Sequence, residues 1–180
     1  MHALICARVD YGNVVYISLS STNASKLQSV LNAAARLIGG IPKFSHISTF
    51  IRNSLHWLPI RQRIQFKICS LVRSCLTDSA PQYLNVLKAY CIPVSSIPSC
   101  STHRSSARGH LVVTRTWTYY MTQSRSFAIV GPSNWTKLTL SLRDLFPISS
   151  APFHKHLKPL YLSVKTLIWV GSASDLSGAI

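Results

Sequence analysis

The chain has 180 residues, enough for one ordinary domain or two small ones and no more, with an apolar content of 47% that can supply a core. Charge is the anomaly, because 19 Lys and Arg side chains face four Asp and no Glu, a formal net charge of +15. Such a chain repels itself and attracts polyanions, so nucleic acid is the first partner to consider; the alternative is a solvated surface whose acids were lost.

The first half of the chain predicts helices. Residues 1–20 are expected to be a strand or an irregular lead-in, and residues 21–23 offer capping side chains for a helix that Gly39 and Gly40 stop. A short second helix is expected at about 46–54. The first helix carries an apolar stripe at helical spacing, formed by Leu27, Val30, Leu31, Ala34, Leu37 and Ile38.

A third helix, at about 59–77, is the most informative segment. Pro59 suits its first turn, because the missing N–H is one of the donors that a helix start leaves unpaired. Trp57 and Leu58 are expected to pack onto the first stripe, at Leu27, Leu31 and Leu37. The helix keeps one apolar side, formed by Ile60, Ile64, Ile68, Leu71, Val72 and Cys75. Its cationic outer edge is expected to carry Arg61, Arg63 and Lys67.

The character of the chain changes after a fourth helix at about 81–89, which is expected to turn Tyr83, Leu84 and Leu87 inward. Residues 91–110 predict a linker. Residues 111–120 and 126–130 are expected to pair as strands, and the Gly-Pro-Ser turn at 131–133 to open a short helix around Trp135, Leu138 and Leu142. Pro152 and Pro159 are expected to break the closing helix at 150–165, because an interior proline costs about 3 kcal/mol.

Together these elements predict an α+β fold that is mainly α. A four-helix subdomain would occupy residues 1–90, followed by the linker at 91–110. A small β-hairpin with a short helix and a C-terminal helix would occupy residues 111–165, and residues 166–180 would form a tail.

Catalytic chemistry has no visible basis in the sequence. A catalytic site with two metal ions needs acids that hold the ions about 3.5–4 Å apart. His154 and His156 have no Cys or Glu at ligand spacing for zinc, and His56 is expected to be a packed histidine. We therefore expect no enzyme activity, no catalytic residue, no metal and no cofactor. The only acids are scattered, at Asp10, Asp78, Asp144 and Asp175.

Basic and aromatic residues interleave around the predicted hairpin. Arg115, Trp117 and Arg125 are expected to bind RNA or single-stranded DNA without sequence preference, because aromatic faces stack on unpaired bases and Arg neutralises phosphate. The alternative is that Trp117 fills a core under the hairpin. For the cationic edge of the third helix, the alternative is a solvated helix face.

The cysteines and the hydropathy indicate the compartment. Five cysteines form no C-x-x-C pair, and the apolar stretch at residues 3–7 is too short for a secretion signal, so a reducing compartment, cytoplasmic or nuclear, is expected. No run approaches the roughly 18 apolar residues that a spanning helix needs, so no membrane partner is expected.

An ordered series of short motifs carries a family resemblance. The run LHWLPIRQRIQFK at 55–67 resembles the segment downstream of the catalytic core in reverse transcriptases of non-long-terminal-repeat retrotransposons, the jockey and chicken-repeat groups. About 150 residues are covered in one collinear series, and residues 166–180 match nothing in it. The other motifs are RVDYGN at 8–13, LQSVLNAAARLI at 27–38, APQYL at 80–84, RSS at 104–106, LVVTRT at 111–116, RSFAIVGPSNWTKL at 125–138, LRD at 142–144 and FHKHLK at 153–158.

The resemblance implies the non-catalytic, thumb-like part of a reverse transcriptase, placed near a template–primer duplex. Neither the paired aspartates of the polymerase nor the acids and histidines of the endonuclease are in this chain. The leading expectation is therefore nucleic-acid binding without catalysis. The alternative, motivated by Asn53, Ser54 and Gln65 where the family usually carries an acid, is a decayed transposon remnant that acts at most as a structural or interaction protein.

Overall fold

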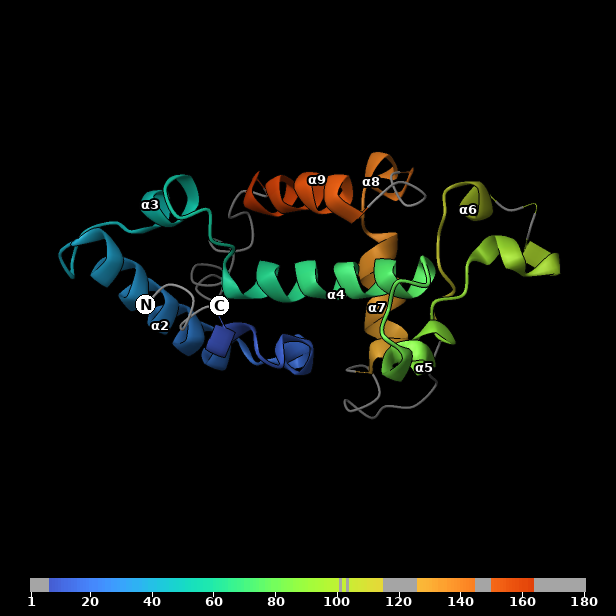
Figure 1. Cartoon of the computed structure of the whole chain (residues 1–180), viewed down its shortest axis with the longest axis horizontal. Coiled ribbons are helices and arrows are strands. Elements are labelled where there is room, and N and C mark those ends of the chain that lie inside the picture. The colour runs from blue at the N-terminus through green and yellow to red at the C-terminus, as the bar shows by residue number, and fades with distance from the viewer. Residues whose placement is uncertain (1–6, 101, 103, 115–125, 145–149, 164–180) are drawn as a thin grey trace, which may run out of the picture.

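A computed structural model describes residues 7–100, 102, 104–114, 126–144 and 150–163, and helices dominate this part of the chain (Figure 1). Residues 7–10 are helical as well. The elements are η1 (Asn13–Ser18), α2 (Ser21–Gly39), α3 (Ser48–Asn53), α4 (Ile60–Leu76), η2 (Gln82–Leu84), α5 (Asn85–Lys88), η3 (Val94–Ser96), η4 (Pro98–Cys100), α6 (Arg104–Ala107), α7 (Phe127–Thr136), α8 (Leu140–Asp144) and α9 (Ser150–Ser163).

Helix α4 is the centre of the fold, and the other long elements pack around it (Figure 1). Helix α9 runs alongside it in the opposite direction, η1 and α2 lie near its first half, and α7 crosses its second half. The crossing depends on Gly131, because a Cβ there would lie 3.1 Å from the Phe127 ring and 3.2 Å from Val72. The buried residues of α4 are Ile60, Arg63, Ile64, Ile68, Cys69, Val72, Arg73 and Cys75.

The first three predicted helices are present. Ser20 caps α2 by accepting a hydrogen bond from the Asn23 amide, and Gly40 ends it in a left-handed conformation. The predicted stripe is only half right, because Leu31 and Ala34 are buried whereas Val30 and Leu37 are exposed. The buried face of α2 is therefore narrower than the apolar stripe that its sequence predicted.

The prediction that Trp57 and Leu58 pack into the core before α4 is confirmed, and we call these two residues the plug. Their exposed fractions are 4% and 5%, and they belong to the same buried cluster as Leu31. Leu37 was wrongly assigned to this contact, since 73% of it is exposed. The plug links the α2–α3 hairpin to the rest of the core.

The predicted β-hairpin, and with it the α+β class, is wrong. The described residues contain no strand, and residues 127–130 form the first turn of α7 instead of pairing. Ser126 caps this helix, and Trp135 is buried with 2% exposure, so tertiary packing overrides the β-propensity of the segment. Gly131 and Pro132 lie inside the helix and do not form a turn before it. The other half of the expected hairpin falls largely on residues 115–125, which lie outside the described residues.

The closing helix is not broken by its prolines. Pro152 lies in the first turn of α9, where its missing N–H has no partner to lose, and Pro159 lies inside the helix. Burying a large apolar side chain contributes about 1.5–3 kcal/mol. Phe153, Leu157 and Tyr161 are all buried, so their packing against the core more than offsets the cost of Pro159.

The described residues around Cys91 and Leu111, at the two ends of the predicted linker, pack onto the rest of the molecule. Cys91 and Leu111 are buried in the main cluster, Leu111 makes an isolated bridge with Pro93, and the Trp135 indole N–H donates to the Gly109 carbonyl at 3.3 Å. The fourth predicted helix shrinks to η2 and α5. Its Tyr83 was wrongly expected to face inward, since it is 78% exposed.

None of the described helices combines the length and the apolar character that crossing a membrane requires.

Candidate nucleic-acid interface

The cationic edge predicted for α4 is divided by the helix geometry. Arg61 and Lys67 are exposed, whereas Arg63 is buried, so its placement on the outer edge was wrong. Six residues of an α-helix turn through about 600°, which places Arg61 and Lys67 about 120° apart around the axis. These two cations therefore face different sides of α4 and cannot bind one phosphate group together.

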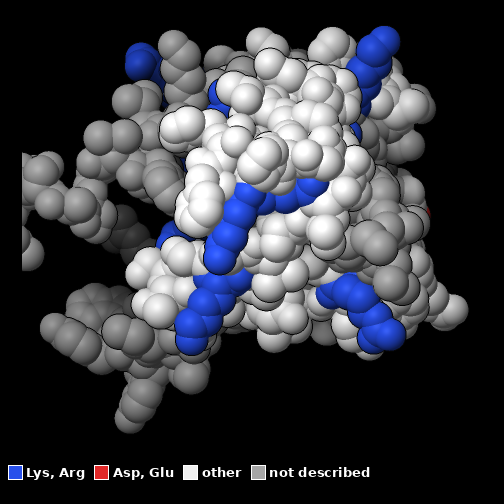
Figure 2. All heavy atoms as spheres, turned by 90° about the vertical axis from the view of Figure 1, so that its left-hand side faces the viewer, with Lys and Arg blue, Asp and Glu red and all other residues white. Residues whose placement is uncertain are grey.

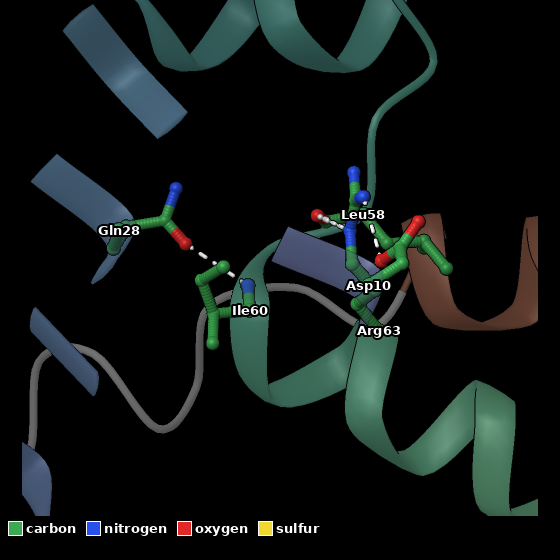
Figure 3. A network of polar contacts seen from close by, with 5 residues as sticks. All are labelled: Asp10, Gln28, Leu58, Ile60 and Arg63. Carbon is green, nitrogen blue, oxygen red and sulfur yellow. Dashed lines mark hydrogen bonds and ion pairs between the residues drawn. The ribbon is translucent and has the colours of Figure 1, made fainter. Parts of the chain in front are cut away.

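Arg63 has a structural role (Figure 3). Its guanidinium Nη1 donates to Asp10 Oδ1 at 2.9 Å, and Nε donates to the Leu58 carbonyl at 3.4 Å. Nearby, the Ile60 amide donates to Gln28 Oε1 at 3.0 Å, which fixes α2 to the start of α4. Arg63 thus joins the N-terminal segment to the plug before α4, and its charge is already compensated.

The two acids whose side chains are described are both used within the protein. Asp10 pairs with Arg63 near the start of α4, and Asp78 pairs with Lys88 just beyond its end. Arg63 and the end of α4 at Leu76 are 13 residues apart, which is about 20 Å of helix. These carboxylates are therefore too far apart to share a pair of metal ions.

The C-terminal helix adds a basic surface that the sequence analysis did not single out. Lys155 and Lys158, three residues apart on α9, are exposed neighbours on one face. His154 sets the register between the helices, because its Nε2 lies 3.1 Å from Ser70 Oγ and its ring lies 5.8 Å from that of Phe66.

Because α9 runs antiparallel to α4, Lys158 lies one turn beyond His154 in the direction of Lys67. Within the described residues, neither of these lysines nor Lys155 forms an ion pair. We call Lys67, Lys155 and Lys158 the α4–α9 basic face. The signal available in the sequence was the run FHKHLK at 153–158, in which Lys155 lies between the buried Phe153 and Leu157 and Lys158 directly follows Leu157.

Cationic side chains are also scattered over the end of the molecule formed by α2 and α3. Figure 2 looks onto this end and shows Lys and Arg spread among neutral side chains, with almost no acidic surface on the residues that are drawn in colour or white. The exposed cations of this region include Lys26, Lys43 and Arg52. The remaining predicted binding residues, Arg115, Trp117 and Arg125, lie outside the described residues.

The nucleophilic groups of the core are protected. Burial raises the pKa of the Cys69 thiol to about 11 despite a contact with the Tyr161 hydroxyl, and burial together with Cys75 raises the pKa of Cys91 to about 12. These thiols stay protonated at neutral pH and behave as small apolar groups. No group of three or more His, Cys, Asp or Glu in the described ranges is arranged to hold a metal ion.

Comparisons with known proteins add no relative. No protein-family model matches the chain, and neither the curated proteins nor the solved structures contain a significant match.

Proposed function

We propose that the protein binds RNA and single-stranded DNA without sequence preference and without catalysing a reaction on them. The observation that carries the proposal is the disposition of charge. The two acids whose side chains are described pair with Arg63 and Lys88, while the α4–α9 basic face and the end in Figure 2 expose cations that, among the residues the structure describes, have no acid paired with them. Non-specific binding needs only such phosphate-neutralising cations, which release condensed counterions from the nucleic acid.

We further propose that the chain corresponds to the post-catalytic region of a non-long-terminal-repeat reverse transcriptase. The ordered motifs of the sequence support this origin, and the separation of Asp10 from Asp78 accords with a part that does no chemistry. A reading frame that continues upstream in the genomic DNA into a Y-x-D-D or F-x-D-D motif would support it further.

The second candidate is a decayed remnant of such an element, without an evolved function. The excess of Lys and Arg over acids also favours this candidate, because the loss of acids alone leaves a basic chain. The two candidates differ in what they require of the exposed cations, since only binding requires them to act together.

Binding of labelled U20 RNA, dT20 and a 20-base-pair duplex to the wild-type protein, at several salt concentrations, distinguishes the two. We expect micromolar affinity for the single strands and a log–log salt slope of roughly 0.7 per phosphate contact. Absence of binding at 50 mM salt would contradict the proposed function and leave the remnant.

A further inference from the structure

The loop between α2 and α3 holds an aromatic side chain in the solvent. Phe44 is 95% exposed, and Lys43 beside it places its Nζ 5.9 Å from the centre of the Phe44 ring. A large apolar ring at the tip of a turn is costly to leave in water, and turn positions favour small polar residues. Phe44 contributes nothing to the core, and its ring is available for contact with a partner.

The turn that carries Phe44 is held firmly. The Ser45 amide donates to the Pro42 carbonyl at 3.2 Å and closes the turn, and the Arg36 guanidinium donates to the Ser45 carbonyl at 3.4 Å. On its two sides, Ile41 packs against the core and Ile47 is buried with 4% exposure. The ring is therefore presented on a fixed platform, which lowers the entropic cost of binding a partner.

The start of the loop explains why it can be so tight. Gly40 adopts φ +60°, and a Cβ on Gly39 would lie 2.7 Å from the Phe50 ring. The Ile41 amide then donates to the Arg36 carbonyl at 3.1 Å, which reverses the chain directly after α2. Arg36 is thus fixed at the base of the loop while Lys43 stands beside the ring.

We propose that Phe44 is a stacking platform for an unpaired base, with Lys43 neutralising the adjoining phosphate. This inference rests on the proposed function and deepens it, because it supplies a preference for single strands over duplex. Stacking on an aromatic face tolerates every base, and a neighbouring cation binds the backbone. A membrane surface fits less well, since insertion needs several apolar side chains on one side and the flanking Ile41 and Ile47 face the protein.

The test compares Phe44→Ala with wild type for binding of dT20 and of a duplex. We expect dT20 to bind about 5- to 30-fold more weakly, the lower part of the range for loss of one stacked base. Duplex affinity should change less than twofold, and the salt slope should stay the same because no phosphate contact is lost. Lys43→Gln should instead lower the slope by roughly 0.7.

Two further variants sharpen the result. Phe44→Trp should bind dT20 at least as well as wild type, whereas Tyr83→Ala, which removes another exposed ring that has no Lys or Arg next to it in the sequence, should bind as wild type does. The inference is overturned if Phe44→Ala binds dT20 as tightly as wild type does, or if the substitution weakens binding of the duplex as much as binding of dT20. It is also overturned if the only binding that Phe44→Ala loses is binding to phosphatidylserine vesicles. Wild-type protein that binds no nucleic acid would refute the proposed function itself, a distinct outcome.

Discussion

Replacing Trp57 by alanine should lower the free energy of unfolding by about 3–5 kcal/mol, the usual cost of removing a buried Trp side chain. Trp57 is 4% exposed and, with Leu58, joins the α2–α3 hairpin to the core around α4. A domain of this size commonly has only about 5–15 kcal/mol of stability. Urea unfolding followed by circular dichroism should therefore show a large shift of the midpoint or a protein that is already unfolded.

The matched controls lie on α2. Leu31 is fully buried, so Leu31→Ala should cost about 2–5 kcal/mol, whereas Leu37 is 73% exposed and Leu37→Ala should stay within about 0.5 kcal/mol. An unfolding midpoint that Trp57→Ala leaves in place would mean that the plug does not form. Equal effects of the two leucine substitutions would contradict the orientation of α2.

Phe153→Ala should be equally damaging, at about 3–5 kcal/mol, and should also reduce the helical signal. The ring is completely buried, stacks on Trp135 with centroids 5.9 Å apart, and lies 5.1 Å below the guanidinium of the buried Arg73. Helix α9 contains Pro159, so it depends on this packing more than an ordinary helix does.

A leucine at this position separates the two contributions of the ring. Phe153→Leu keeps most of the apolar volume and should cost only about 1–2 kcal/mol, mainly through the lost contacts with Trp135 and Arg73. The same urea melts measure it. If Phe153→Ala melts like wild type, α9 does not pack on α4 as described.

Helical spacing predicted α2, α3 and α4 well, because each has a cap, an apolar side or a stop signal within its own sequence. The plug at Trp57 and Leu58 was also predictable, since large apolar side chains directly before an amphipathic helix are stabilised by burial against its apolar side. Val30 and Leu37 were misjudged, because the width of the buried face depends on how much of α2 its neighbours cover.

The second half of the fold was predicted poorly for a physical reason. Residues 126–130 are β-prone in isolation, and only the contact with α4 through Gly131, together with the Ser126 cap, selects a helix. Pro159 was judged by its local cost, whereas the gain from Phe153 and Leu157 appears only in the packed structure.

In the candidate site, too, features set by composition were predictable, whereas contacts between residues far apart in the sequence were not. The basic character of the chain follows from its composition, but the pairing of Arg63 with Asp10 joins residues 53 positions apart. The exposure of Phe44 depends on where Ile41 and Ile47 are anchored. No spacing rule within the sequence predicts either arrangement.

The central claim is that the α4–α9 basic face binds nucleic acid. The most direct test is the salt dependence of dT20 binding by a variant in which glutamine replaces Lys67, Lys155 and Lys158. Three exposed cations are lost with little effect on the core, so the slope should fall by about two units and affinity at 0.1 M salt by about 100-fold. Lys88→Gln is the control for one lost charge, because Lys88 pairs with Asp78, and its slope should match wild type. Equal slopes for the triple variant and the wild type would show that the α4–α9 basic face is only solvated surface.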